Sequence, residues 1–373
     1  MGKPLKIILI GPAPPFRGGI SDTQVLLAEA LQNEGHQVSL WSFTQQYPKI
    51  FFPGKTQRQK KNQSTSVPIR QMIHGFAPWQ WLRISNLLKK EKADLIIFRY
   101  WTPFFAPCWA FLARRVGFKT IRLGLVDNWT PHENYIGTKY LNRFFANSMD
   151  AFMCLSPYVA QQLQKNTPKK VWWSPHPLPE NLPPKKSKSK ARKNLGWPQD
   201  TPTLVFAGLV REYKGLDHLI EACRFIRETR GIRFELRVGG AFYSPITPYQ
   251  KQIRAAGLES SVHLNDAFLS PKELRDYICA ASLLVLPYKR GTQSGIIAQG
   301  IYYNTPLLVT NIGGLAEQIQ DYPKGFVVES SAKALAQGIE KILENKSQKD
   351  NSWATEHPNW KTFAQTLLAG IPQ

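Results

Sequence analysis

The chain has 373 residues, a length that suits two α/β domains of about 150–200 residues better than one core. Apolar residues make up 43% and charged residues 20%, which excludes a disordered or collagen-like chain. No run of about 18 apolar residues occurs, so we expect neither a signal peptide nor a transmembrane helix. The net charge of +22 lies mostly in residues 1–200, and it points to nucleic acid, an anionic membrane or a phosphorylated substrate as partner.

In the first half of the chain, short strand-like runs alternate with helix-like segments. This rhythm is typical of βαβ units and predicts an α/β fold with a parallel sheet. We expect helices over 22–34 and 105–116, and strands over 6–11, 37–43, 94–101, 120–126 and 151–155.

The first expected strand runs into the loop GPAPPFRGGISD. There Gly18 and Gly19 directly precede a helix that Ser21 or Asp22 could cap. Glycines let backbone amides approach an anion, and a helix N-terminus favours negative charge. A phosphate-binding turn and a plain strand-to-helix connection both fit this pattern.

Two later segments, 51–62 and 79–92, combine aromatic residues with lysines and arginines. Such a mixture suits an interfacial segment on anionic lipid, and Trp79 and Trp81 would be its aromatic anchors. A helix packed on the core, with a solvated basic face, is the alternative.

After the expected strand 120–126, Asp127 and His132 are the candidates for a general base or an electrostatic contact. The four cysteines, Cys108, Cys154, Cys223 and Cys279, stand far apart, so we expect core thiols and neither a zinc site nor a disulfide framework.

Residues 175–198 are rich in proline and basic residues, which predicts irregular structure. We therefore place a basic linker at 181–200, between a domain at 1–180 and a second at 201–355. Residues 356–373 are expected to form a helix that packs back on the first domain.

The second half restarts the alternation, with expected strands at 203–208, 233–239, 262–264, 283–288 and 306–310. Arg211 and Lys214 follow the first of these strands, and two cations there suit a diphosphate. Thr292, Ser294 and Gly295 stand at the start of a later helix, which again favours an anion.

The pattern F-x-G-x-x-R-x-Y-K-G at 206–215, the Ser294-Gly295 loop and P-L-L-V-T-N-x-G-G-L-x-E at 306–317 resemble the donor half of glycosyltransferase family 4. The resemblance implies a GT-B fold, in which two Rossmann-like domains face each other across a cleft. It also implies that Arg211 and Lys214 hold the diphosphate of a nucleotide sugar, that Gly18 and Gly19 approach the donor from the other domain, and that no metal or other cofactor takes part.

One departure from the family concerns two glutamates eight positions apart, whose places Gly291 and Gln299 occupy here. Gln299 can still bond ribose hydroxyls. Sugar recognition would then fall to the TQSG segment, so the expected donor site comprises Thr292, Gln293, Ser294, Gly295, Ile296 and Gln299.

We therefore expect a retaining, metal-independent glycosyltransferase of cell-surface polysaccharide biosynthesis. Its acceptor would be lipid-linked or a polysaccharide precursor, and the enzyme would be cytoplasmic and peripheral at the inner face of a bacterial membrane. The alternatives are a non-catalytic relative that binds nucleotide sugar or lipid, a nucleic-acid-binding protein, and a GT-B epimerase or phosphorylase. The sequence contains no recognisable nucleic-acid module.

Overall fold

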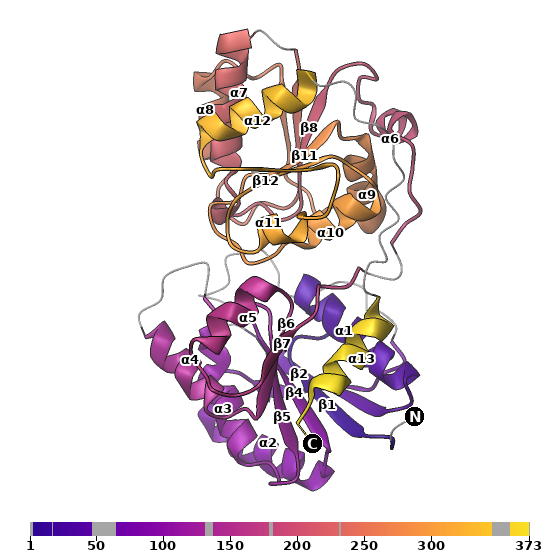
Figure 1. The fold of residues 1–373 in the computed structure, drawn as a ribbon, viewed down its shortest axis with the longest axis vertical. Helices are drawn as coiled ribbons and strands as arrows, with labels where there is room; N and C mark the ends of the chain where they lie inside the picture. The colour runs from indigo at the N-terminus through magenta and orange to yellow at the C-terminus, as the bar shows by residue number, and fades with distance from the viewer. Residues whose placement is uncertain are drawn as a thin grey trace. The chain divides into compact units, whose positions relative to one another are not determined.

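The computed structural model describes residues 3–16, 18–46, 65–130, 137–178, 182–230, 233–344 and 359–372. The chain divides into two compact units, Met1–Glu180 with His357–Gln373 and Asn181–Glu356 (Figure 1). Both units are α/β, with helices covering a parallel sheet, as the sequence predicted. Among the described residues, no helix is long and apolar enough to cross a membrane.

The first unit contains a seven-stranded parallel sheet in the order β3-β2-β1-β4-β5-β6-β7. The order reverses between β1 and β4, so this pair is the topological switch point. The strands are β1 (Lys6–Ile10), β2 (Gln37–Gln45), β3 (Ile69–His74), β4 (Leu95–Tyr100), β5 (Ile121–Val126), β6 (Ala151–Cys154) and β7 (Val171–Trp173).

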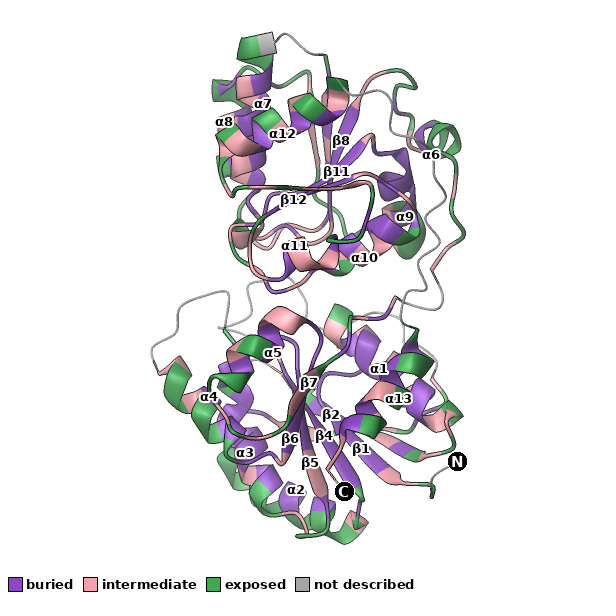
Figure 2. Cartoon of the chain, in the orientation of Figure 1, coloured by how far each residue is buried: buried purple, intermediate pink, exposed green. Residues whose placement is uncertain are grey.

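Helices cover both faces of this sheet, and its central strands are buried along their length (Figure 2). One face packs against α2 (Pro78–Glu91), α3 (Ala106–Arg114), α4 (Thr138–Ala146) and α5 (Pro157–Gln164). The other face packs against α1 (Gly19–Asn33) and α13 (Trp360–Gly370). The C-terminal helix therefore belongs to the core of the first unit, where its Trp360, Phe363 and Leu367 are fully buried.

The second unit repeats this plan with six parallel strands in the order β10-β9-β8-β11-β12-β13. Its switch point lies between β8 and β11. The strands are β8 (Thr203–Ala207), β9 (Glu235–Gly239), β10 (Val262–Asn265), β11 (Leu283–Leu286), β12 (Leu307–Thr310) and β13 (Gly325–Val328).

Helices of the second unit also cover both faces of their sheet. One face packs against α7 (Leu216–Arg230), α8 (Thr247–Ala255) and α12 (Ala332–Glu344). The other packs against α6 (Lys188–Leu195), α9 (Pro271–Ala280), α10 (Gly295–Tyr302) and α11 (Leu315–Gln318). The four cysteines are free and buried in the two units, as expected of core thiols.

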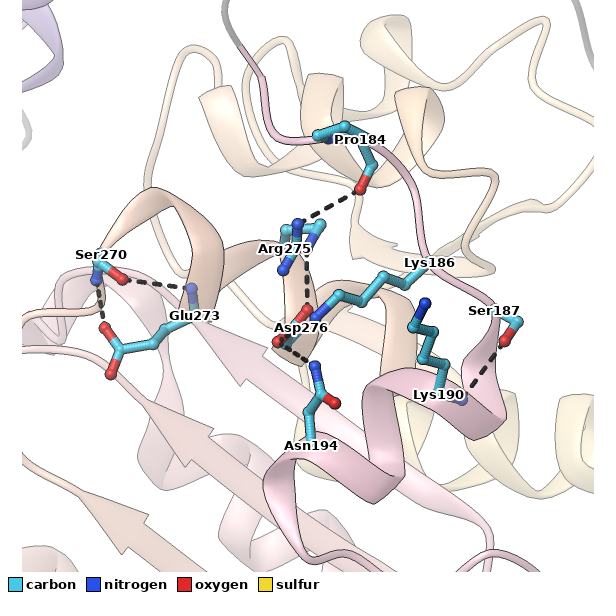
Figure 3. Close-up of polar contacts among 9 residues, drawn as sticks. All are labelled: Pro184, Lys186, Ser187, Lys190, Asn194, Ser270, Glu273, Arg275 and Asp276. Carbon is cyan, nitrogen blue, oxygen red and sulfur yellow. Dashed lines mark hydrogen bonds and ion pairs between the residues drawn. The ribbon is translucent and has the colours of Figure 1, made fainter.

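The prediction of irregular structure over 175–198 is wrong, because α6 occupies Lys188–Leu195. The hydroxyl of Ser187 caps the helix by accepting the backbone N–H of Lys190 at 3.3 Å. Figure 3 shows Lys186 and Asn194 directed at the carboxylate of Asp276 on α9, with nitrogen–oxygen distances of 3.0 and 3.2 Å. The basic segment thus packs against α9 of the second unit through polar contacts.

One residue of that segment, Arg192, is 2% exposed and explains why the helix forms where composition argued against it. Its guanidinium donates to the carbonyls of Ala280 and Pro198 and to the hydroxyls of Thr203 and Ser282, at 3.0–3.2 Å. Two of these partners, Ala280 and Ser282, lie 88 and 90 residues away in the sequence, so the local pattern of lysines and prolines does not reveal them.

Three strands were missed by the sequence analysis, namely β3, β7 and β13. Each is the outermost strand of its sheet and mostly half-buried or exposed, so it lacks the apolar run or clean alternation of an inner strand. The predicted cap of α1 was also wrong, because Gly18 is the N-cap, with φ 121°, and Ser21 and Asp22 lie inside the first turn.

Candidate functional site

The switch point of the second sheet is built from two loops, 208–215 after β8 and 287–294 after β11. In open parallel sheets, ligands bind beyond the carboxyl ends of the strands at this point. Two glycines let the loops pack closely. Gly215 has φ 70°, and a Cβ there would lie 2.0 Å from the carbonyl oxygen of Pro287. Gly208, with φ 100°, leaves room for Ile296 and the Lys214 ammonium group.

The two cations predicted at this edge, Arg211 and Lys214, are both half-buried. The Arg211 guanidinium lies over the ring of Tyr243, 4.8 Å from its centroid, and the Lys214 ammonium lies 5.3 Å from that of Tyr288. Neither side chain forms an ion pair with a described residue. Burial, chiefly, lowers the pKa of Lys214; Tyr213 opposes this shift and the Arg211 charge adds to it. Such a cation gains electrostatic stabilisation when an anion binds beside it.

Tyr288 connects this cationic loop to the helix start at Gly295. Its hydroxyl lies 3.1 Å from Ser294 Oγ, while its ring supports Lys214. Burial raises the pKa of Tyr288 to about 12, although the Ser294 hydroxyl pulls it down, so the phenol stays neutral at physiological pH. The structure therefore brings Lys214 and Ser294 into one site.

The predicted TQSG segment contains polar groups with hydrogen bonds inside the protein and others that could bind a ligand. The backbone N–H of Ser294 donates to the Gln318 side chain at 2.8 Å, so this amide is occupied within the protein. Thr292 is 4% exposed, and Gln293 Oε1 is buried without a partner among the described residues. Gly295 is exposed, and no described atom lies within 4 Å of where its Cβ would be.

In the first unit, the loop after β1 carries Gly18 and Gly19 to the start of α1. A Cβ on either glycine would meet no described atom within 4 Å. Gly19 is exposed, so its backbone is open to approach from outside the unit.

The side chain of Asp127 accepts two hydrogen bonds at 2.6 Å from Arg99, the penultimate residue of β4. The side chains of Arg99 and Asp127 are 0% and 7% exposed. The guanidinium also reaches Thr23 Oγ1 at 3.4 Å, and the Arg99 carbonyl accepts the indole N–H of Trp109. Because both carboxylate oxygens are bonded, Asp127 is arranged as a fixed charge rather than as a free base.

Two family models match the chain and together cover nearly all of it. The model of the glycosyl transferases group 1 matches residues 187–360, and the model of Glycosyltransferase Family 4 matches residues 17–177. The chain belongs to the family 4 glycosyltransferases of GT-B fold.

Two curated relatives and one solved structure resemble this family 4 glycosyltransferase. A D-inositol 3-phosphate glycosyltransferase of Corynebacterium aurimucosum is 30% identical over 42% of this chain and 38% of its own length. The putative teichuronic acid biosynthesis glycosyltransferase TuaC of Bacillus subtilis is 29% identical over 41% and 36%. These alignments thus span little more than a third of the relatives. The Anabaena HepE structure, in complex with UDP and glucose, shares the fold, with a TM-score of 0.69, 15% identity and coverage of 97% and 95%.

From the sequence, a departure from the family is expected at Gly291 and Gln299, in place of two glutamates. A Cβ at Gly291 would lie 3.2 Å from the Tyr288 ring and 3.4 Å from Leu315, so a longer side chain needs its neighbours to shift. Gln299 is half-buried on α10. The tyrosine that joins Lys214 to Ser294 therefore occupies the space beside position 291.

Sequence reasoning missed Arg99 and His176 at the edge of the first sheet. The signal for Arg99 was a lone arginine inside the apolar strand LIIFRY, followed by Asp127 after the neighbouring strand. His176 follows β7 and packs against Trp360 with ring centroids 5.9 Å apart. Burial is the largest influence on His176 and lowers its pKa, against a hydrogen bond with the Pro177 carbonyl.

Several other predictions meet the structure differently. His132 and the segment 51–62 lie outside the described residues. Trp81 is 8% exposed and donates to the His74 carbonyl at 3.0 Å, so it is a core residue and the prediction that it anchors in a membrane is wrong. Trp79 is 77% exposed. Among the described residues, no group of three or more His, Cys, Asp and Glu side chains could hold a metal ion.

Proposed function

We propose that the protein transfers a sugar from a nucleotide-sugar donor to an acceptor hydroxyl, with the donor diphosphate at the switch point of the second sheet. The observation that carries this proposal is the pair of cations, Arg211 and Lys214, which form no ion pair with a described residue. They lie at the edge of the sheet where ligands of such folds bind, beside the open start of α10. By contrast, Lys289 of the neighbouring loop is paired with Asp217.

In the proposed reaction, the bond between the anomeric carbon and the diphosphate oxygen breaks, and its electron pair leaves with the diphosphate. The acceptor oxygen bonds to the same carbon, and its proton passes to the leaving phosphate. Charge therefore develops on the diphosphate, where Arg211 and Lys214 stabilise it without a metal. We propose retention of anomeric configuration on the family resemblance alone.

The sugar itself would contact the TQSG segment, since no glutamate stands at positions 291 and 299. Gln293 and Gln299 offer amides to sugar or ribose hydroxyls, and the buried Gln293 Oε1 has no partner among the residues that the structure describes. Gly18 and Gly19 are proposed to approach the donor through their open backbone.

For the acceptor, we propose a lipid-linked sugar or polysaccharide precursor at the inner face of the cell membrane. Support comes from α2, whose exposed face carries Trp79, Leu82 and Leu87 beside Arg83 and Lys90. The acidic residue of α2, Glu91, is ion-paired with Lys6 and Arg70. A basic helix face with exposed apolar side chains suits the surface of anionic lipid. The name of the Bacillus relative, a putative teichuronic acid enzyme, agrees with a cell-surface product.

A thermal-shift screen against UDP-, GDP-, ADP- and dTDP-sugars tests the donor assignment. One nucleotide series should raise Tm, because a ligand that binds only the folded state stabilises it by mass action. The shift should be lost in Arg211→Ala and Lys214→Ala, and kept in Lys289→Gln. Binding without hydrolysis or transfer of the sugar would instead favour the non-catalytic alternative, and the absence of any shift would contradict the donor site.

A further inference from the structure

The residue at the start of α10, Ser294, does not use its side chain to cap that helix. A serine at the N-cap position ordinarily accepts a hydrogen bond from an amide of the first turn. Here the Ser294 hydroxyl forms no such bond with a described residue, and it lies 3.1 Å from the hydroxyl of Tyr288 instead. The side chain therefore stabilises a contact within the 287–294 loop rather than its own helix.

The backbone of Ser294 is held by a second side chain, the carboxamide of Gln318 on α11. Gln318 Oε1 accepts the Ser294 N–H at 2.8 Å, and Gln318 Nε2 donates to the Ser294 carbonyl at 3.5 Å. The close approach of the two segments requires Gly313, just before α11, which has φ 56°. A Cβ there would overlap the carbonyl oxygen of Gly291. Ser294 is thus fixed through its hydroxyl and through both polar groups of its backbone.

Tyr288 is itself held firmly by its surroundings. It is 3% exposed, and its carbonyl accepts hydrogen bonds from the hydroxyls of Thr310 at 2.6 Å and Ser330 at 3.2 Å. Its ring packs edge-on against Tyr213, and the Lys214 ammonium group lies 5.3 Å from the ring centroid. One buried residue therefore contacts both a cation proposed for the diphosphate and the loop that leads into α10.

These contacts indicate that the place of the TQSG segment relative to Lys214 is important for binding. Recognition of a ligand requires groups held within about 0.5 Å of the productive geometry, and neighbouring side chains must supply that support. Gly291 has no side chain that could support the loop from within, and Gly295 is exposed. The support on the page comes from Tyr288 and Gln318.

We propose that Tyr288 and Gln318 are positioning residues for the donor sugar, which hold the TQSG segment in place beside Lys214 so that the sugar and the diphosphate are bound together. This inference rests on the proposed transferase function and adds residues that set the geometry of its donor site. Both side chains act through Ser294. Removing either hydrogen bond should weaken recognition of the sugar and leave recognition of the diphosphate intact.

The test uses the full chain and isothermal titration calorimetry with paired probes. UDP-, GDP-, ADP- and dTDP-sugars report on the sugar and the diphosphate together, and the corresponding free nucleoside diphosphates report on the diphosphate alone. Tyr288→Phe removes the hydroxyl and keeps the ring beside Lys214. Gln318→Met removes the carboxamide and keeps a side chain of similar length.

Tyr322→Phe is the matched control in the same unit. Tyr322 is 5% exposed, and its hydroxyl donates to the carbonyl of Thr305 at 3.0 Å, beyond the other end of α10. This variant loses a buried hydrogen bond of the same kind without touching Ser294. A fall in Tm common to Tyr288→Phe and Tyr322→Phe therefore measures the structural effect alone.

At least one nucleotide sugar should bind the wild-type protein. Tyr288→Phe and Gln318→Met should each bind it about tenfold more weakly, which corresponds to the loss of one hydrogen bond. Both should bind the free nucleoside diphosphate within about twofold of wild type, and Tyr322→Phe should bind both probes within about twofold. Since the two variants release Ser294 from different sides, either one tests the proposal should the other fail to fold.

The proposal is overturned if the variants bind the nucleotide sugar like wild type, or if they lose the free diphosphate as strongly as the nucleotide sugar. Equal loss of sugar binding in Tyr322→Phe would also overturn it, because the effect would then be a general one on the fold. Failure of the proposed function would look different, since no probe would bind even the wild-type protein.

Discussion

The two sheets share one topology, yet the edges at their switch points differ in charge and in bonding. At β8 and β11 the half-buried cations Arg211 and Lys214 have no anionic partner among the described residues. At β1 and β4 the cation Arg99 is fully buried and bonded to Asp127, and the side-chain amide of Gln24 has no hydrogen-bond partner in the described part of the chain. The fold thus decides where a ligand binds, and the loop residues decide which ligand it is.

The largest effect should come from breaking the ion pair of the first unit. Arg99→Ala leaves the carboxylate of Asp127 buried without its partner, and loss of one member of a buried pair destabilises by about 3–5 kcal/mol. The free energy of unfolding from urea titrations measures this change. Arg122→Ala is the control, since its pair with Asp150 is about a third exposed and should contribute about 1 kcal/mol or less. Equal losses of unfolding free energy in the two variants would show that the buried ion pair stabilises the fold no more than the half-exposed pair does.

The cations of the second unit should affect catalysis rather than folding. Arg211→Ala or Lys214→Ala should lower the transfer rate by about 10²–10³, or about 2–4 kcal/mol, because the leaving diphosphate loses a stabilising charge. Single-turnover kinetics and the urea midpoint, measured on the same samples, separate the two effects.

Lys289→Gln is the matched control for these variants, because Lys289 already has Asp217 as its partner. It should retain most of the activity. Full transfer activity in Lys214→Ala would contradict the proposed role of this cation at the switch point of the second sheet.

A smaller effect is expected at Asp22, because burial raises the pKa of its carboxyl group from its ordinary value of about 4 to about 6. Between these values the folded state holds a proton that the unfolded state has lost, so stability falls as pH rises from about 4 to about 6. Asp22→Asn removes this dependence and should be more stable than wild type at pH 7 by about 1–3 kcal/mol.

Urea titrations of wild type and Asp22→Asn at a series of pH values measure that difference. The two curves should coincide in acid and separate as pH rises. Curves that run parallel at every pH would contradict the burial of the charge.

The smallest effects should lie on the exposed face of α2. Each of Arg83, Lys89 and Lys90 should contribute about 1 kcal/mol to binding of anionic vesicles, and the contribution should shrink as salt rises. Flotation of wild type and of the triple glutamine variant measures it. Trp79 fluorescence should shift to the blue on binding, whereas the buried Trp81 should not respond. Equal flotation of the two proteins would show that the basic face of α2 does not contribute to membrane binding.

Much of the fold could be predicted from the sequence alone. The inner strands β1, β4, β5, β8 and β11 are apolar runs with turn residues beside them, so pattern reasoning placed each within two residues of its observed ends. Edge strands such as β3 and β13 lack that pattern, and the helix α6 was hidden among prolines and lysines. Some partners that hold α6 in place, such as Asp276 for Asn194, are far away in the chain.

For the candidate site, the sequence determined the loops and the residue types, because strand order in βαβ units places loop ends at one edge of a sheet. It thereby selected Arg211 and Lys214 and the glycine turns. Only the tertiary structure decided that Tyr288 joins Lys214 to Ser294, that Trp81 lies in the core, and that Asp127 is bound by Arg99. Two of these contacts, that of Lys214 with Tyr288 and that of Arg99 with Asp127, join side chains from segments that are distant in the sequence. The hydrophobic periodicity along the chain does not show which side chains meet or which polar groups are left without a partner.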